Sequence, residues 1–134
     1  MEAVTILIAD DDVVWSNTIA RLLEAEGYRV LRARTGVDAL YQARMRRPHL
    51  LLLDPDLPQL SGWAICRRLR QSPDFANVKI VLLTLDGAAA HRAGADGYLP
   101  KSGQESATLP PVRVFRYPAP GILAAFAERH AAAA

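Results

Sequence analysis

The chain has 134 residues and a net charge of +2, and hydrophobic and charged residues make up 51% and 22% of it. This composition indicates one soluble globular domain and excludes a disordered chain. No apolar run approaches the roughly 18 residues of a membrane span, and the N-terminus lacks the basic segment of a signal peptide. The single cysteine, Cys66, excludes an internal disulfide and is typical of a reducing compartment, so we expect a cytoplasmic protein.

The basic residues are scattered along the chain, with small clusters at 44–47 and 67–70. Nucleic-acid binding usually requires a basic stripe together with a docking motif, and the sequence shows neither. We interpret the two clusters as solvated helix faces, and we expect neither a nucleic-acid nor a membrane partner.

The first predicted elements are a strand and a helix. Residues 4–9 (VTILIA) form an apolar, β-branched run of strand length, which three aspartates follow directly. Residues 13–26 repeat apolar side chains at helical spacing, and Gly27 is expected to end that helix.

A second pair of elements repeats this order. Residues 28–33 are a predicted strand, and Thr35 is placed to cap a helix that Pro48 prevents from continuing. Residues 49–53 (HLLLL) are the most apolar stretch, as expected of a strand that is covered on both faces.

The middle of the chain is punctuated by prolines. Residues 55–62 (PDLPQLSG) must form a loop, a helix is predicted at 63–70, and a strand is predicted at 79–83. A short alanine-rich piece precedes a brief fifth strand at 97–99. Strands that alternate with helices indicate an α/β fold with a parallel sheet covered on both faces.

Acidic, hydroxyl and cationic side chains follow the ends of these predicted strands. They are Asp10 and Asp11, Asp54, Thr84 and Lys101. The carboxyl ends of parallel strands share one edge of the sheet, where ligands bind beside a topological switch point. Three carboxylates there would repel one another without a cation, and Mg²⁺ accepts carboxylates together with waters and phosphate oxygens.

An aspartate beside a metal ion and a lysine is equipped for covalent phosphoryl transfer. Metal and lysine would neutralise charge on the transferring group, and the hydroxyl of Thr84 would hydrogen-bond one of its oxygens. Taken singly, these residues are also typical helix caps, turn residues, strand residues and solvated lysines. Their arrival together at successive strand ends favours a chemical role.

Four segments resemble those that define response-regulator receiver domains (CheY-like), the phosphoacceptors of two-component signalling: ILIADDD, HLLLLDPDLPQLSG, KIVLLT and AGADGYLPK. The resemblance covers about residues 4–102. It implies a flavodoxin-like, doubly wound sheet of five parallel strands in the order 2-1-3-4-5. We expect a single receiver domain over 1–134, with a proline-rich excursion at 103–120 and a C-terminal helix at 121–133.

The resemblance also implies a metal site and a phosphate donor. Asp54 would accept the phosphoryl group from a sensor histidine kinase or a phosphotransfer protein. Asp11 and Asp54 would bind Mg²⁺ through their side chains, Asp56 through its backbone carbonyl, and Asp10 through a metal-bound water.

Further residues match the family's switch and tuning positions. Thr84 and Tyr98 would form the switch pair, in which the hydroxyl moves toward the phosphate and the ring swings inward behind it. Lys101 would pair with a phosphoryl oxygen. Asp56 and Asp86 match positions that tune the lifetime of the phosphate, and the signal would pass by contact with an unidentified downstream protein.

Three features depart from the family pattern. Leu85 stands where a small residue usually follows the threonine, and we expect it to roof the site partly. Ser102 takes the place of the proline that usually follows Lys101. The span 84–94 is short, so we expect the fourth helix to be shortened to about a turn or lost, which together with 103–120 alters the output face.

These departures leave an alternative to the phosphorylatable receiver, namely a degenerate receiver that binds its partners without phosphorylation. We expect a signalling receiver and not an enzyme, because a receiver catalyses only its own phosphotransfer and dephosphorylation. A third alternative is a haloacid-dehalogenase-like phosphatase, which the segment LLLLDPDLP resembles. The order of the acidic residues argues against such a phosphatase. In that family the acidic pair comes last along the chain, whereas Asp10 and Asp11 come first here.

Overall fold

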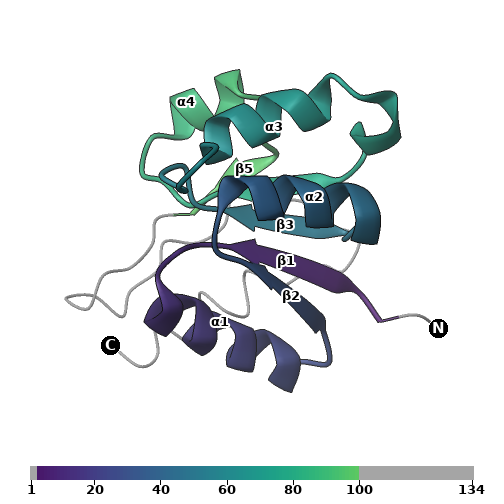
Figure 1. Ribbon diagram of the computed structural model, residues 1–134, viewed down its shortest axis with the longest axis vertical. Coiled ribbons are helices and arrows are strands. Elements are labelled where there is room, and N and C mark those ends of the chain that lie inside the picture. Colours follow the sequence, from purple (N-terminus) through teal and green to yellow (C-terminus); the bar gives the residue numbers. More distant parts are fainter. Residues whose placement is uncertain (1–2, 100–134) are drawn as a thin grey trace.

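A computed structural model describes residues 3–99, and Figure 1 shows a central sheet with helices on both of its faces. The elements are β1 (Thr5–Ala9), α1 (Val13–Ala25), β2 (Arg29–Ala33), α2 (Gly36–Arg46), β3 (Leu50–Leu53), α3 (Gly62–Arg70), the 3₁₀ turn η1 (Pro73–Phe75), β4 (Lys79–Leu82), α4 (Gly87–Arg92) and β5 (Gly97–Tyr98). The predicted alternation is confirmed. Lys101, Ser102, the proline-rich segment and the C-terminal helix lie outside the described residues.

The sheet is parallel throughout and has the order β2-β1-β3-β4-β5, as predicted. The chain runs outward from β1 to β2 and then returns to place β3 on the other side of β1. Ala9 pairs with Leu53 across β1 and β3, so Asp10 and Asp54 are the next residues on neighbouring strands. The amide of Asp54 donates to the carbonyl of Ala9 at 2.9 Å, which ties the two strand ends together at the topological switch point.

Each face of the sheet carries its own apolar cluster, because side chains alternate along a strand. One cluster lies beneath α2, α3 and α4 and takes from the sheet Leu7, Ala9, Ala33, Leu51, Leu53, Ile80 and Leu82. The other lies beneath α1 and takes from the sheet Ile6, Ile8, Leu50, Leu52 and Val81. The leucines of β3 are buried on both faces, which explains why that segment is the most apolar of the sequence.

The helices begin at capping side chains that the sequence supplies. Asp12, Thr35, Ser61 and Asp86 each accept a hydrogen bond from the backbone amide three residues on. Gly27 follows the last turn of α1 with a φ of 95°, a conformation that glycine adopts without strain. Within residues 3–99, none of the helices combines the length and the apolarity of a membrane span.

The fourth helix is shortened, as the spacing predicts, but it is not lost. It spans six residues, from Gly87 to Arg92. The cap at Asp86 begins it, and Gly94, with a φ of 94°, turns the chain into β5. A short helix on this side leaves a smaller surface beside β5 than a longer helix would provide.

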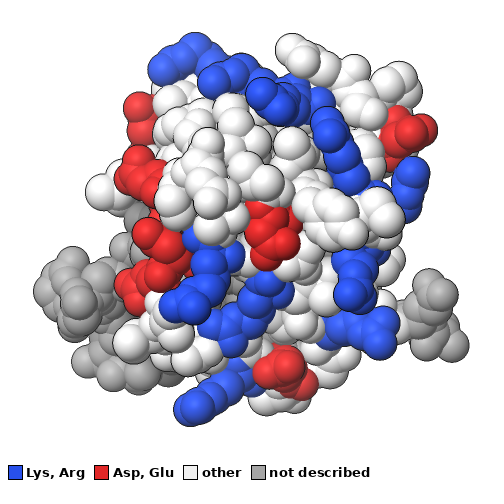
Figure 2. Space-filling view, in the orientation of Figure 1, with Lys and Arg blue, Asp and Glu red and all other residues white. Residues whose placement is uncertain are grey.

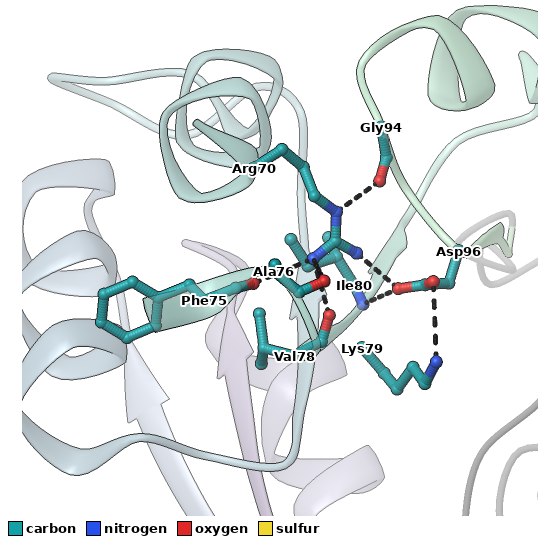
Figure 3. Close-up of polar contacts among 8 residues, drawn as sticks. All are labelled: Arg70, Phe75, Ala76, Val78, Lys79, Ile80, Gly94 and Asp96. Carbon is teal, nitrogen blue, oxygen red and sulfur yellow. Dashed lines mark hydrogen bonds and ion pairs between the residues drawn. The ribbon is translucent and has the colours of Figure 1, made fainter. Parts of the chain in front are cut away.

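The guanidinium of Arg70, at the end of α3, joins segments that are far apart in the sequence (Figure 3). Its Nε donates to the carbonyl of Gly94 at 2.7 Å, and Nη1 donates to the carbonyls of Phe75 and Val78 at 3.2 and 2.8 Å. Nη2 forms an ion pair with the Oδ2 atom of Asp96 at 2.6 Å.

Asp96 completes this network from the other side. Its Oδ2 atom also accepts the amide of Ile80 at 2.8 Å, and its Oδ1 atom lies 4.0 Å from the Nζ atom of Lys79. The side chains of Arg70 and Asp96 are only 19% and 29% exposed, so solvent screens their attraction incompletely. The network therefore fixes the start of β5, two residues before Tyr98.

Cys66 provides a prediction on the pH dependence of folding. Its side chain is fully buried on α3, and burial raises the pKa of the thiol from 9.0 to about 11. Below pH 9 both states keep the proton, whereas between pH 9 and 11 only the unfolded chain releases it. Across this window, we expect the free energy of unfolding of the original protein to fall by about 2 kcal/mol more than that of the Cys66→Ala variant. Urea titrations of both proteins measure this difference, and parallel pH profiles would contradict the prediction.

Candidate functional site

Three carboxylates meet at the carboxyl ends of β1 and β3. Oxygens of Asp10, Asp11 and Asp54 all lie within 4.8 Å of one another. Asp10 and Asp54 are 1% and 7% exposed, whereas Asp11 faces solvent, so the group is open on one side. Acidic side chains gather along the left margin of Figure 2, the side on which the strands end in Figure 1.

Short backbone bonds orient the two buried carboxylates. The Oδ1 atom of Asp10 accepts the amide of Asp12, and the Oδ1 atom of Asp54 accepts the amide of Asp56, both at 2.9 Å. Each bond closes a tight turn immediately after a strand, as aspartate does readily. The turns therefore hold the carboxylates at the edge of the sheet, and Asp12, which also caps α1, links the first turn to that helix.

Gly62 supports the backbone of Asp54 from the start of α3. A Cβ atom at Gly62 would lie 2.4 Å from the carbonyl oxygen of Asp54 and 3.0 Å from the Cα atom of Pro55. The amide of Gly62 donates to the carbonyl of Pro55 at 3.0 Å. The loop after β3 thus folds back onto the strand end, and only glycine fits at the point of contact.

Thr84 and Asp86 follow β4 at the same edge of the sheet. The Oγ1 atom of Thr84 accepts the amide of Asp86 at 3.1 Å. The Oδ1 atom of Asp86 accepts the amide of Ala89 at 2.9 Å and so caps α4. Both Asp86 and Asp56 are exposed, and the side chain of Leu85 between Thr84 and Asp86 is 83% exposed.

Tyr98 lies on β5 and packs against the first residue of α4. A Cβ atom at Gly87 would lie 2.5 Å from the Cε1 atom of the Tyr98 ring, so the ring rests where a side chain would otherwise be. A cavity of about 70 Å³ lies beside the ring, between α4 and β5. The half-buried tyrosine therefore has space next to it in which the ring can move.

The structure brings most of the predicted site residues to one edge of the sheet. Asp10, Asp11 and Asp54 form the acidic group, and Asp56, Thr84, Leu85 and Asp86 follow the ends of β3 and β4. Lys101 lies outside the described residues. The supporting roles of Gly62, Gly87, Arg70 and Asp96 were not predicted from the sequence. The Ser-Gly pair at the start of α3 was an available signal for a close approach, because glycine is otherwise unfavourable in a helix.

The acidic group fits a divalent cation. Three carboxylate oxygens in a group open to solvent match the hard oxygen ligands that Mg²⁺ prefers, with room for water and phosphate oxygens. In the part of the chain that the structure describes, histidine and cysteine take no part in such a group, which disfavours a zinc site.

Comparisons with known proteins agree with this geometry. The family model of the response regulator receiver domain matches residues 6–110. The response regulator MprA of Mycobacterium ulcerans (strain Agy99) is 39% identical over 104 residues, which are 74% of this chain and 44% of that relative. The matched stretch therefore spans less than half of the relative.

Two solved structures share the fold and part of the sequence. One is a putative response regulator from Chloroflexus aurantiacus J-10-fl, with 34% identity, a TM-score of 0.71, and coverage of 75% of this chain and 86% of that one. The other is the receiver domain of a sensor histidine kinase from Pseudomonas aeruginosa PAO1, with 30% identity, a TM-score of 0.68, and coverage of 77% and 88%. That second structure has a magnesium ion coordinated in its active-site cleft.

The family match extends over most of the sequence, and the sheet order and the acidic group are those that the resemblance implies. The alternative of a dehalogenase-like phosphatase is therefore rejected. The chain belongs to the response regulator receiver domain family of two-component signalling.

Proposed function

We propose that this receiver accepts a phosphoryl group on Asp54 in a Mg²⁺-dependent reaction and signals by protein contact. The observation that carries the proposal is the group of three carboxylates at the switch point of the sheet. Asp54 is 7% exposed, so most of the residue is held by the fold while a small part of it can meet a donor.

The residues that would hold Mg²⁺ are Asp11 and Asp54 through their side chains, Asp56 through its carbonyl, and Asp10 through a bound water. When bound, the ion would supply positive charge that offsets the clustered carboxylates and the incoming phosphoryl group. The magnesium ion in the Pseudomonas aeruginosa receiver, which is 30% identical to this chain, supports the same choice of metal here.

In the proposed transfer, a carboxylate oxygen of Asp54 attacks the phosphorus of the donor. The bond from phosphorus to the donor's nitrogen or oxygen breaks, and the donor keeps the electron pair. The product is an acyl phosphate, which water later hydrolyses to inorganic phosphate and the original carboxylate. The turn after β3 fixes the orientation of the Asp54 carboxylate, because the Oδ1 atom of Asp54 accepts a hydrogen bond from the amide of Asp56. A fixed carboxylate favours attack in one direction.

Thr84, Tyr98 and Lys101 would sense the new phosphoryl group. The hydroxyl of Thr84 accepts the amide of Asp86 and would donate its own hydrogen to a phosphoryl oxygen. Lys101 would pair with another phosphoryl oxygen. Movement of Thr84 would leave space for the ring of Tyr98, which has a cavity beside it, and the population would shift between two conformations.

The phosphate donor would be a sensor histidine kinase or a phosphotransfer protein, and the recipient of the signal would be another protein in the cytoplasm. The fold supports a contact-dependent signal, because the start of α4 packs against the ring of Tyr98 on β5 and would move with it.

The proposal is tested with beryllium trifluoride, which has the tetrahedral shape of a phosphoryl group when it binds a carboxylate. Addition with Mg²⁺ is expected to shift the amide resonances of Thr84 and Tyr98 as well as those near Asp54. The Asp54→Asn variant should show neither shift. Shifts confined to the acidic group in the original protein would show binding without a switch.

Leu85 is proposed to limit access to Asp54. Its side chain is 83% exposed and makes few packing contacts, so Leu85→Ala should change the stability by less than about 0.5 kcal/mol. We expect this variant to be phosphorylated by acetyl phosphate faster, and to lose the phosphate faster, each by less than about tenfold. Rates equal to those of the original protein would remove Leu85 from the set of tuning residues.

A degenerate receiver that binds partners without phosphorylation is the second candidate. The six-residue α4 favours it, because this helix adjoins Tyr98 and a short helix limits how far a change at the ring can spread. Binding of Mg²⁺ without any phosphorylation would support this candidate over the first.

A further inference from the structure

The outward side of α2 carries an apolar stripe that the core does not use. Val37, Tyr41 and Met45 stand four residues apart and are 56%, 62% and 63% exposed. The side chains of this helix that reach the sheet are Ala39, Leu40 and Ala43, which are buried. Residues spaced by four lie along one side of a helix, so the three exposed side chains form a continuous row.

The segment around this stripe holds much of the basic charge of the protein. Residues 29–47 contain six arginines and one acidic residue, a local net charge of +5 (6 − 1) against +2 for the whole chain. The arginines are Arg29, Arg32, Arg34, Arg44, Arg46 and Arg47, and all are exposed. Figure 2 shows basic side chains over the region between α1 and α2.

A cavity of about 380 Å³ lies at the N-terminal end of the stripe. Val13, Arg32, Arg34, Thr35 and Asp38 line it. Arg32 is directed by a hydrogen bond of 2.7 Å from its Nη2 atom to the hydroxyl of Ser16, which lies on α1. Two arginines, Arg32 and Arg34, therefore line a cavity at the start of α2, the helix that carries the apolar row.

Asp38 lowers the positive potential of this cavity only in part. Its Oδ2 atom accepts a hydrogen bond from the Nε2 atom of Gln42 at 3.0 Å, which turns this oxygen toward its own helix. The same amide nitrogen donates to the carbonyl of Arg32 at 2.7 Å and so covers one backbone oxygen of the edge strand β2.

We propose that this face of α2, defined by Val37, Tyr41, Met45, Arg34 and Arg44, binds an acidic amphipathic helix of a partner protein. Apolar side chains of the partner would pack along the stripe, and its carboxylates would meet Arg44 at one border and the arginines of the cavity at the other. Tyrosine and arginine are the residue types that most often dominate binding energy at such interfaces.

Charge and chemistry favour this occupant over two others. A second copy of the chain would bring one arginine-rich face against another, at a cost in repulsion. Duplex DNA would match the arginines but would leave the row of Val37, Tyr41 and Met45 without apolar contact. The acidic carboxyl edge of the sheet would repel the same helix, so binding on α2 leaves Asp54 accessible and does not require its phosphorylation.

The test uses the ¹⁵N-labelled full chain and a stapled helical peptide with leucines on one face and glutamates on both flanks. A matched peptide carries lysine in place of every glutamate. We expect saturable shifts of the α2 amides with the first peptide alone, and an affinity that falls as salt is added. Tyr41→Ala and Arg44→Glu are each expected to weaken binding about tenfold. Val14→Ala, a change of an exposed apolar residue on α1, and Asp54→Asn should leave it unchanged.

Several results would overturn the proposal. They are equal binding of the lysine peptide, shifts centred away from α2, and the absence of saturation. Tighter binding of a DNA duplex at the same residues would replace it by a nucleic-acid site, and a dimer that Tyr41→Ala dissolves would replace it by self-association. Because Asp54→Asn is a control here, loss of phosphorylation and loss of peptide binding are separate results.

Discussion

The Gly62→Ala variant is expected to lose about 2–4 kcal/mol of folding free energy, and the protein that remains folded is expected to be phosphorylated poorly. The added methyl group would lie 2.4 Å from the carbonyl oxygen of Asp54, which is backbone and cannot turn aside. Relief requires a shift of α3 or of the end of β3, and either shift moves the carboxylate of Asp54. Urea unfolding measures the first effect, and the rate of phosphorylation by acetyl phosphate measures the second.

Gly27→Ala is the matched control for this prediction. Gly27 has open space around it and a φ of 95°, so its substitution strains the backbone without a collision near the site. We expect it to cost about 1–2 kcal/mol and to leave the phosphorylation rate of the folded protein unchanged. Equal effects of the two variants on phosphorylation would show that Gly62 does not position Asp54.

The Arg70→Met variant is expected to lose about 3 kcal/mol of folding free energy. Methionine keeps much of the apolar stem that passes Gly94 but removes the hydrogen bonds to the carbonyls of Gly94, Phe75 and Val78 and the ion pair with Asp96. Several carbonyls and one half-buried carboxylate then lose a charged donor. Because both side chains of the pair are partly exposed, water replaces some of these bonds and limits the loss.

Arg67→Met, on the same helix but exposed, is the control and should change the stability by less than about 0.5 kcal/mol. Asp96→Asn tests the other side of the network and should also be destabilising, since it removes the charge that Arg70 neutralises. In Arg70→Met, hydrogen exchange of β5 should accelerate more than that of β1. A loss below about 1 kcal/mol for Arg70→Met would show that the network contributes little to the fold.

Strand ends were the most predictable part of the site. The apolar runs before Asp10, Asp54 and Thr84 have strand length, and the parallel order of the strands brings their ends to one edge. Capping by Asp12 and Thr35 was also predictable, because the side chain of a capping residue acts within three residues of its own position. Local chemistry and element order therefore account for the acidic group.

The supporting contacts were not predictable from local pattern. Arg70 and Asp96 are 26 residues apart, and the ion pair depends on how closely the end of α3 approaches the start of β5. Gly62 and Gly87 read as ordinary turn and helix-start residues until the positions of Asp54 and Tyr98 are known. The apolar stripe of α2 was not predicted for a related reason, because spacing alone does not say which apolar residues of a helix remain exposed.

The central claim is that Asp54 is the phosphoacceptor, and its most direct measurement is the intact mass of the protein after incubation with acetyl phosphate at neutral pH. With Mg²⁺ present, we predict the addition of one phosphoryl group, which chelation of the metal prevents and which is absent from Asp54→Asn. Addition to the Asp54→Asn variant, or no addition to an original protein that binds Mg²⁺ normally, would contradict the account.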